Sequence, residues 1–366
     1  MRDRQRLIGQ RFMVGFDGQQ ASSDVKRMIR DFGVGHVIFF ARNVDGPEQL
    51  AELARELQSV ARDAGHDIPL LLAVDQEGGR VARLRSPWTS WPPLRALGRS
   101  GSEDLTRQMG QALAVELSAC GIRLDFAPVM DVDSNPRNPI IGERSFGDDP
   151  SLVARLGVAM IRGLQEGGVA ACAKHFPGHG DTDTDSHLEL PAVDHSRSRL
   201  EDVELRPFRA AVEAGVATIM TAHVLVRELD DRLPASLSPP VIDILRRQMK
   251  YDGVVVADDL EMKAVAAHWA PGPAAALAAK AGCDILPVCA SHDAQASAIE
   301  GLIRAVEAEE IPWTEVDASA LRIRRLKEKY LLPYRDPNPK QARLAAGAGE
   351  RVALAQEIAG RGGIAV

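Results

Sequence analysis

Short apolar runs rich in β-branched residues recur eight times along this chain, and each is followed by a longer stretch with helical spacing. The runs are residues 11–16, 36–40, 69–75, 124–132, 169–176, 217–224, 253–259 and 283–289. Helices are predicted near 22–32, 47–64, 102–120, 150–167, 199–214, 239–250, 261–281 and 291–308. Near-continuous apolar strands are typical of a parallel sheet with helices on both faces. Eight such units predict an α/β fold, a (β/α)8 TIM-type barrel.

The barrel is expected to span residues 1–335, followed by a linker-like C-terminal helical tail over residues 336–366. A doubly wound sheet is the alternative, but no GxGxxG sequence opens a helix after the first run. A helix around residues 315–330 is expected to pack across the outside of the barrel. Its Arg-rich part, residues 322–330, is most simply a solvated face. The tail holds no candidate site residue, so we expect it to be dispensable for chemistry.

Composition and charge exclude several classes of protein. The formal charge is −7 and no basic cluster contains aromatics, so we expect no nucleic-acid partner. No apolar run approaches the roughly 20 residues that span a bilayer, and the N-terminal stretch lacks the apolar core of a signal peptide. Four scattered cysteines form no CxxC pair. We therefore expect a cytoplasmic, reduced, monomeric protein without a membrane partner.

Acidic residues end the third and seventh apolar runs. In the predicted barrel these positions lie at the C-terminal face, where barrel enzymes have their catalytic residues. The acidic residues are Asp75 and the pair Asp258 and Asp259. A buried carboxylate costs free energy unless it has partners or a role. One residue of the pair can face the barrel mouth while the other caps the next helix, and the pattern does not decide which. For Asp75 the alternative is a salt bridge to Arg80 or Arg83.

The loop after the fifth run, residues 174–187, concentrates His and Asp. It lacks the Gly and Glu of an EF-hand, and a Pro-Gly pair separates His175 from His179, so we expect no metal and no cofactor. At the spacing of Asp185 and His187, the carboxylate can fix the tautomer of the imidazole. Such a dyad transfers protons near neutral pH. A solvated polar loop is the alternative.

Two more polar residues follow apolar runs. Arg144, in the loop after the fourth run, is suited to bidentate contacts with a carboxylate, although lone loop arginines are usually exposed. His223 ends the sixth run. It is more often a hydrogen-bonded structural residue, and a role in lining the site is the alternative.

Several segments together resemble the family 3 glycoside hydrolases, and within them the NagZ-type β-N-acetylglucosaminidases of peptidoglycan recycling. The segments are DQEGGRV (75–81), NPIIGERSFGDDP (138–150), KHFPGHGDTDTDSH (174–187), PASLSP (234–239) and GVVVADDLEM (253–262). The resemblance covers roughly residues 5–335 and implies a TIM-type barrel.

The resemblance also implies roles for individual residues. Asp258 is the implied nucleophile, and Asp185 and His187 form the implied acid/base dyad, with His187 moving the proton. The implied contacts to the N-acetylglucosamine unit come from Asp75, Arg83, Arg144, Lys174 and His175. Arg85 is the alternative to Arg83, because both lie in the stretch VARLR.

The activity implied is that of a retaining exo-β-N-acetylglucosaminidase, which removes terminal β-linked GlcNAc from muropeptides by double displacement. A phosphorylase is one alternative, since a histidine tolerates an incoming anion that a carboxylate repels. A β-glucosidase-like member is another. It is disfavoured because those relatives carry a second domain that supplies a glutamate, for which this chain has no room. A non-catalytic sugar-binding barrel is the alternative outside the enzymes.

Overall fold

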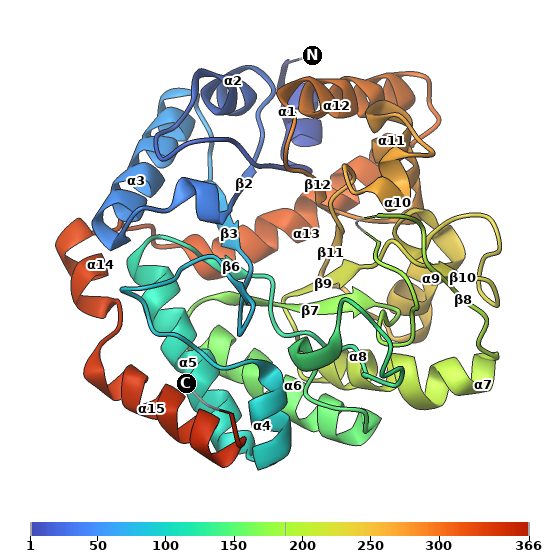
Figure 1. The fold of residues 1–366 in the computed structure, drawn as a ribbon. Coiled ribbons are helices and arrows are strands. Elements are labelled where there is room, and N and C mark those ends of the chain that lie inside the picture. The colour runs from blue at the N-terminus through green and yellow to red at the C-terminus, as the bar shows by residue number, and fades with distance from the viewer. Residues whose placement is uncertain (1, 187, 365–366) are drawn as a thin grey trace.

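The computed structural model describes residues 2–186 and 188–364, and its centre is a sheet of eight parallel strands (Figure 1). The strands are β1 (Phe12–Val14), β2 (His36–Phe39), β3 (Leu71–Val74), β6 (Leu124–Asp125), β7 (Ala170–Phe176), β9 (Thr218–Thr221), β11 (Val254–Ala257) and β12 (Leu286–Val288). Their order in the sheet is β11-β9-β7-β6-β3-β2-β1-β12. All eight lie within the predicted runs.

The two outer strands of this order meet and close the sheet into a barrel. Val256 of β11 forms a parallel bridge with Ile285, next to β12. The amide of Ala257 donates to the carbonyl of Ile285 at 2.9 Å, and the amide of Ile285 donates to Val255 at 3.1 Å. The predicted (β/α)8 barrel is therefore confirmed.

Helices surround the strands in the predicted order. They are α1 (Arg2–Gly9), α2 (Ser23–Asp31), α3 (Pro47–Asp63), α4 (Leu94–Ser100), α5 (Glu103–Ala119), α6 (Pro150–Glu166), α7 (Arg197–Arg199), α8 (Leu205–Glu213), α9 (Pro239–Asp243), α10 (Lys263–Ala266), α11 (Pro271–Ala281), α12 (His292–Glu307), α13 (Trp313–Leu331), α14 (Pro339–Ala345) and α15 (Gly349–Arg361). The long loop after β3 also contains a small hairpin, β4 (Gln76–Gly78) and β5 (Val81–Ala82), and β8 (Ala192–Val193) pairs with β10 (Leu225–Val226).

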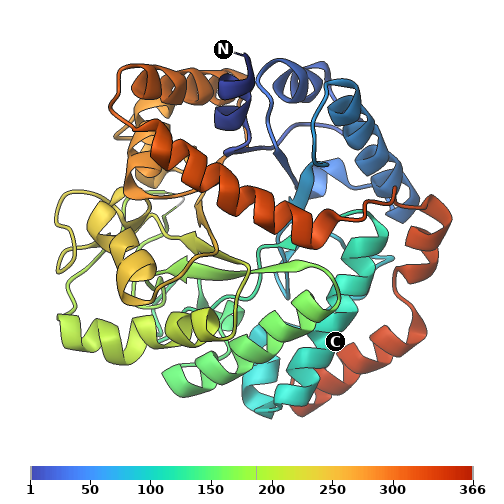
Figure 2. The same cartoon turned by 180° about the vertical axis from the view of Figure 1, so that it is seen from behind.

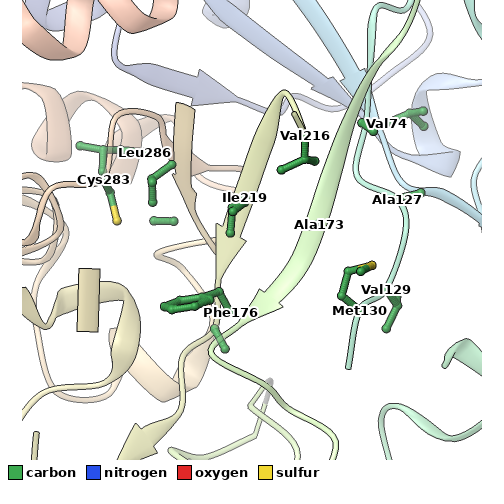
Figure 3. Close-up of a cluster of buried hydrophobic side chains, with 14 of the residues drawn as sticks. Val74, Ala127, Val129, Met130, Ala173, Phe176, Val216, Ile219, Cys283 and Leu286 are labelled. Atoms are coloured by element: carbon green, nitrogen blue, oxygen red, sulfur yellow. The ribbon is translucent and has the colours of Figure 1, made fainter. Parts of the chain in front are cut away.

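Side chains alternate between the barrel interior and the layer under the helices, as expected for β-strands. In β11, Val254 and Val256 point into the interior cluster, whereas Val255 and Ala257 belong to the outer layer. Figure 3 shows part of this outer layer, including Phe176. Strands buried on both faces explain why the apolar runs are nearly continuous.

Helix α13 closes the N-terminal end of the barrel, where it crosses the strands diagonally (Figure 2). Its residues Ile323, Leu326 and Tyr330 belong to the same buried cluster as the inward-facing strand residues. The expected helix around 315–330 is thus present. It covers the open end of the barrel, with one face buried rather than solvated.

The tail forms two helices that pack on the barrel's outer layer. Helix α14 contacts α3 and α5, and α15 contacts α4 and α5. Ala342, Ile358 and Ala359 of these helices are buried. Among the described helices, none is long and apolar enough to span a membrane.

Candidate active site

A cavity of about 500 Å³ opens at the C-terminal ends of the strands. Seven of the predicted site residues line it: Asp75, Arg83, Arg144, Lys174, His175, Asp185 and Asp258. The eighth, His187, lies outside the residues that the structure describes. Arg85 is not among the lining residues, so the cavity favours Arg83 of the two candidates. Residues far apart in sequence converge here because successive parallel strands all end at this face.

Strand alternation directs three of these side chains into the barrel mouth. Asp75 comes one residue after β3, and Lys174 lies in β7. Asp258 directly follows β11 and continues the inward series of Val254 and Val256. Each side chain therefore extends the apolar interior with a charged group at its open end.

His175 reaches the same cavity although Lys174 precedes it directly. The pairing of β7 with β9 is irregular between Ala173 and Phe176. Such a register shift interrupts the regular alternation of side chains. Two consecutive residues of β7 can therefore both line the cavity.

Lys174 holds the charges of the cavity floor together, and its side chain is 2 % exposed. Its ammonium lies 2.8 Å from Oδ1 of Asp75 and 2.6 Å from Oε1 of Glu77. Burial disfavours the ammonium, but the two carboxylates outweigh it and raise the pKa of Lys174. Lys174 therefore stays charged at the floor of the cavity.

Glu77 of β4 also binds Arg144 through a bidentate pair. Nε and Nη2 of Arg144 each donate to a carboxylate oxygen at 2.8 Å. Burial opposes the charge of Glu77, yet Arg144 and Lys174 hold its pKa well below its usual range. This carboxylate therefore fixes two of the predicted sugar-binding cations in position.

Asp131 orients the histidine that faces the cavity. Its Oδ2 lies 2.7 Å from Nδ1 of His175, and its Oδ1 accepts from the amide of His179 at 2.7 Å. Burial opposes the charge on Asp131, but His175 and His179 lower the pKa of the carboxyl. The carboxylate thus sets which edge of the His175 ring points toward Arg144, whose Nη2 lies 3.5 Å from Nε2.

Asp258 and Asp259 differ in their surroundings. Oδ1 of Asp258 accepts from the amide of Asp259 at 2.9 Å, and Oδ1 of Asp259 accepts from the amide of Glu261 at 3.1 Å. Burial raises the pKa of Asp259 to about 7, with Glu261 and Asp258 adding to the effect. Asp259 thus binds the turn after β11 but does not cap α10, whose N-cap is Met262 without a side-chain hydrogen bond. The predicted helix cap is therefore wrong, and Asp259 lines the cavity beside Asp258.

His223 is fully buried and contacts the backbone of this turn. Its Nδ1 lies 2.6 Å from Oγ of Ser236, and its Nε2 lies 2.9 Å from the carbonyl oxygen of Asp259. It does not line the cavity. The structural interpretation of His223 therefore fits the geometry better than a site-lining role.

Glu77 and Asp131 were not predicted as functional residues. Glu77 stands two positions after Asp75 in the motif DQEGGRV, and Asp131 lies near the end of the fourth apolar run. Their partners, Arg144, Lys174 and His175, come from other units of the barrel. The available signal is the position of an acid inside or close after an apolar run. That position does not indicate the residues with which Glu77 and Asp131 pair.

This cavity combines carboxylates on separate elements with ion-paired cations that can donate hydrogen bonds to hydroxyl groups. Asp185 comes from the loop after β7, and Asp258 follows β11. Among the described residues, no group of three or more His, Cys, Asp or Glu is placed to hold a metal ion. A barrel with acidic groups around a sugar-sized cavity has the functional groups that a glycosidase needs.

Comparison with known proteins gives the family. The model of the glycosyl hydrolase family 3 N-terminal domain matches residues 5–326, and the chain belongs to this family. The beta-hexosaminidase of Thiobacillus denitrificans is 40% identical over 284 residues, covering 76% of this chain and 77% of that protein. The beta-hexosaminidase of Neisseria meningitidis serogroup C is 41% identical over 280 residues, covering 74% and 76%.

Solved structures agree with this family. A family 3 β-N-acetylglucosaminidase from Paenibacillus superposes with a TM-score of 0.90 at 40% identity, covering 98% of this chain and 68% of that chain. NagZ from Neisseria gonorrhoeae in complex with N-trifluoroacetyl-D-glucosamine gives a TM-score of 0.80 at 34% identity, covering 96% and 98%. The expected family is confirmed. The chain is a glycoside hydrolase that groups with the beta-hexosaminidases.

Proposed function

We propose that this protein is a retaining exo-β-N-acetylglucosaminidase. The observation that carries the proposal is the convergence of Asp258 and Asp185 on one cavity above the Asp75–Lys174–Glu77 network. Relatives called beta-hexosaminidases, and a NagZ structure that holds an N-acylated glucosamine, support GlcNAc as the sugar.

The proposed reaction proceeds in two displacements. The carboxylate of Asp258 attacks the anomeric carbon while His187, as imidazolium, protonates the leaving oxygen. The same His187 then takes a proton from water, which releases the sugar with its β configuration retained. Asp185 holds the tautomer of His187 and raises its basicity.

The cavity floor is proposed to bind the terminal sugar. Oδ1 of Asp75 pairs with Lys174 and Oδ2 lies 3.4 Å from Arg83, so the carboxylate keeps acceptor capacity for hydroxyl groups. Arg144 and His175 are the other proposed contacts. Because both are held by buried carboxylates, the sugar meets donors already fixed in position.

The natural substrate we propose is a muropeptide fragment with a terminal β-1,4-linked GlcNAc on anhydro-N-acetylmuramic acid. The resemblance to NagZ-type enzymes supports this choice, because NagZ structures are among the similar ones. We further propose that the protein is a monomer in the cytoplasm. The cytoplasm is a compartment in which the four buried free cysteines stay reduced.

A panel of aryl β-glycosides tests the proposal. We expect the GlcNAc derivative to be cleaved faster than those of glucose, GalNAc and xylose, with equal rates in the presence and absence of phosphate. NMR of the first product should show the β anomer. A phosphate-dependent rate that yields a sugar 1-phosphate would instead identify a phosphorylase, and a preference for glucose would identify a β-glucosidase-like enzyme.

A further inference from the structure

A second cavity, of about 410 Å³, lies at the N-terminal end of the barrel, opposite the candidate active site. It is bordered by α1, α13 and residues 65–68, and its apolar walls include Leu7, Ile68, Leu321 and Ile323. Figure 2 faces this end of the molecule. Its volume falls within the range of about 300–1,000 Å³ that is typical of small-molecule sites.

Lys327 of α13 lines this cavity although it is 1% exposed. Its ammonium donates to Oε1 of Gln10 at 2.9 Å and lies 3.5 Å from the carbonyl oxygen of Gly35. Among the side chains described for residues 4–186 and 188–364, no carboxylate lies within ion-pair distance of this ammonium. Burial lowers the pKa of Lys327 to about 7, with no opposing contribution from an acid.

Lys174 at the other end of the barrel is the natural comparison. It is as deeply buried, but it lies within 2.8 Å of carboxylate oxygens of both Asp75 and Glu77, and its pKa is raised. A buried cation is normally paired, because an isolated one is costly to take out of water. Lys327 has the burial of Lys174 without the counter-charge.

The neighbours of Lys327 do not supply a negative charge. Nε2 of Gln10 donates to the carbonyl of Gly33 at 2.7 Å and lies 3.4 Å from Nδ1 of His66. Nε2 of His66 lies 3.0 Å from the carbonyl oxygen of Ile29, which fits a neutral ring, and burial lowers the pKa of His66. The amide and the imidazole are therefore oriented but uncharged.

The rim of the cavity is positive. Arg4, Arg6 and Arg324 line it, and Asp67 is the one acidic residue among the described lining residues. Arg324 pairs with Glu328 along α13. Clustered cations around a concave site raise the local concentration of anions.

We propose that this cavity binds a small monocarboxylate with an apolar body, whose carboxylate pairs with Lys327. One buried ammonium matches one negative charge, whereas a phosphate dianion would leave a second charge unpaired in an apolar site. The aliphatic walls match a hydrocarbon or aromatic body. The site is separate from the glycosidase cavity and does not depend on the function proposed for it.

Calorimetric titration of the full chain with benzoate tests this site. We expect saturable binding with a dissociation constant below about 1 mM, and binding of uncharged benzamide and of inorganic phosphate at least tenfold weaker. Lys327→Met should weaken benzoate binding at least tenfold. Arg325→Met removes a charge from the same helix, but Arg325 pairs with Asp252 and does not line the cavity, so this control should bind benzoate normally.

A second measurement uses the unmodified chain in case Lys327→Met does not fold. Saturating benzoate should reduce acetylation of Lys327 by N-acetoxysuccinimide at least fivefold, as mapped by peptide mass spectrometry, and benzamide should not. Equal protection by both compounds, benzoate binding retained in Lys327→Met, or no saturable binding at about 10 mM would each overturn the proposal.

Discussion

Glu77 is the residue on which the charge balance of the cavity floor depends, because it is 1% exposed and pairs with both Lys174 and Arg144. Removing one partner from a buried ion network leaves the other charges uncompensated. The proposed sugar-binding cations would then no longer be held in place. Loss of Glu77 should therefore disturb the positions of Lys174 and Arg144 and leave the reaction of Asp258 unchanged.

Glu77→Gln should therefore raise KM for an aryl β-GlcNAc by about 10- to 100-fold and change kcat less. Thermal unfolding should occur several degrees lower, since a buried charge pair is broken. Glu143→Gln is the matched control, because Glu143 is exposed and lies next to Arg144 in sequence. An unchanged KM in Glu77→Gln would show that the network has no role in binding.

Asp259 gives a prediction about pH, because its folded pKa of about 7 lies above the value of about 4 expected in the unfolded chain. The folded state therefore binds the proton more tightly, and this group's contribution to stability is lost as pH rises from about 4 to about 7. Asp259→Asn removes the titration. Its melting temperature relative to the wild type should increase between pH 5 and pH 7.5, by an amount that corresponds to about 1–3 kcal/mol.

Substitutions of the two adjacent aspartates should also have different effects on activity. Asp258→Asn should lower kcat by more than about 1,000-fold if Asp258 is the nucleophile, whereas Asp259→Asn should keep most of the activity. Steady-state rates at pH 7 with an aryl β-GlcNAc measure both. The opposite order of effects would move the nucleophile to Asp259.

For single residues, strand alternation and the eight-unit pattern predict that Asp75 and one residue of the Asp258–Asp259 pair face the barrel mouth, whereas Lys174 and the choice of Asp258 come only from the family resemblance. The sequence does not predict Glu77 or Asp131. Their importance comes from partners in other barrel units, and no local spacing encodes those contacts.

At the scale of elements, the C-terminal helices α14 and α15 interact with the loop that follows β5 through one buried carboxylate. Glu116 of α5 accepts from the amide of Gly347 at 2.9 Å and from the amide of Thr89 at 3.1 Å. It also accepts from Nε1 of Trp91 at 3.3 Å. The tail thus contributes packing to the barrel although none of its described residues lines the catalytic cavity.

Deletion of residues 339–366 should therefore lower the melting temperature by several degrees, because buried Ala342, Ile358 and Ala359 and their contacts on the barrel are lost. At 15 °C the kcat/KM of the truncated chain should stay within a few fold of that of the full chain. A large loss of activity in a truncated chain that is still folded would mean that the tail shapes the site.

Helix positions were predicted more accurately than helix continuity. The predicted helix 261–281 is two helices, α10 and α11, and Pro271 occupies the first position of the second, where its missing N–H costs nothing. The predicted helix 199–214 contains a π-helical turn over residues 200–204. The spacing of apolar residues shows which face of a helix is buried. It does not show where a π-helical turn adds one residue.

At the scale of the whole molecule, the barrel separates chemistry at its C-terminal end from the covering helix α13 at its N-terminal end (Figures 1 and 2). The proposed reaction uses side chains of the C-terminal end and no metal. Dialysis against EDTA should therefore leave the rate of aryl β-GlcNAc cleavage unchanged. A loss of rate that one divalent ion restores would contradict the assignment of Asp185 as the partner of His187.

In the proposed mechanism, Asp258 forms a glycosyl-enzyme and His187 supplies acid and then base catalysis. His187→Ala tests it with a dinitrophenyl β-GlcNAc, whose leaving group needs little protonation. The first displacement should still occur and the second should be slow, which gives a burst followed by a low steady rate. Azide, which needs no deprotonation, should accelerate the second step and yield the β-azide.

Mass spectrometry of that variant during the burst is the most direct measurement. We expect one N-acetylglucosaminyl unit attached to the peptide that contains Asp258, and we expect azide to remove it. The mechanism would be contradicted by the absence of an adduct or by an adduct on another peptide. Equal impairment on activated and unactivated substrates without azide rescue would also contradict it.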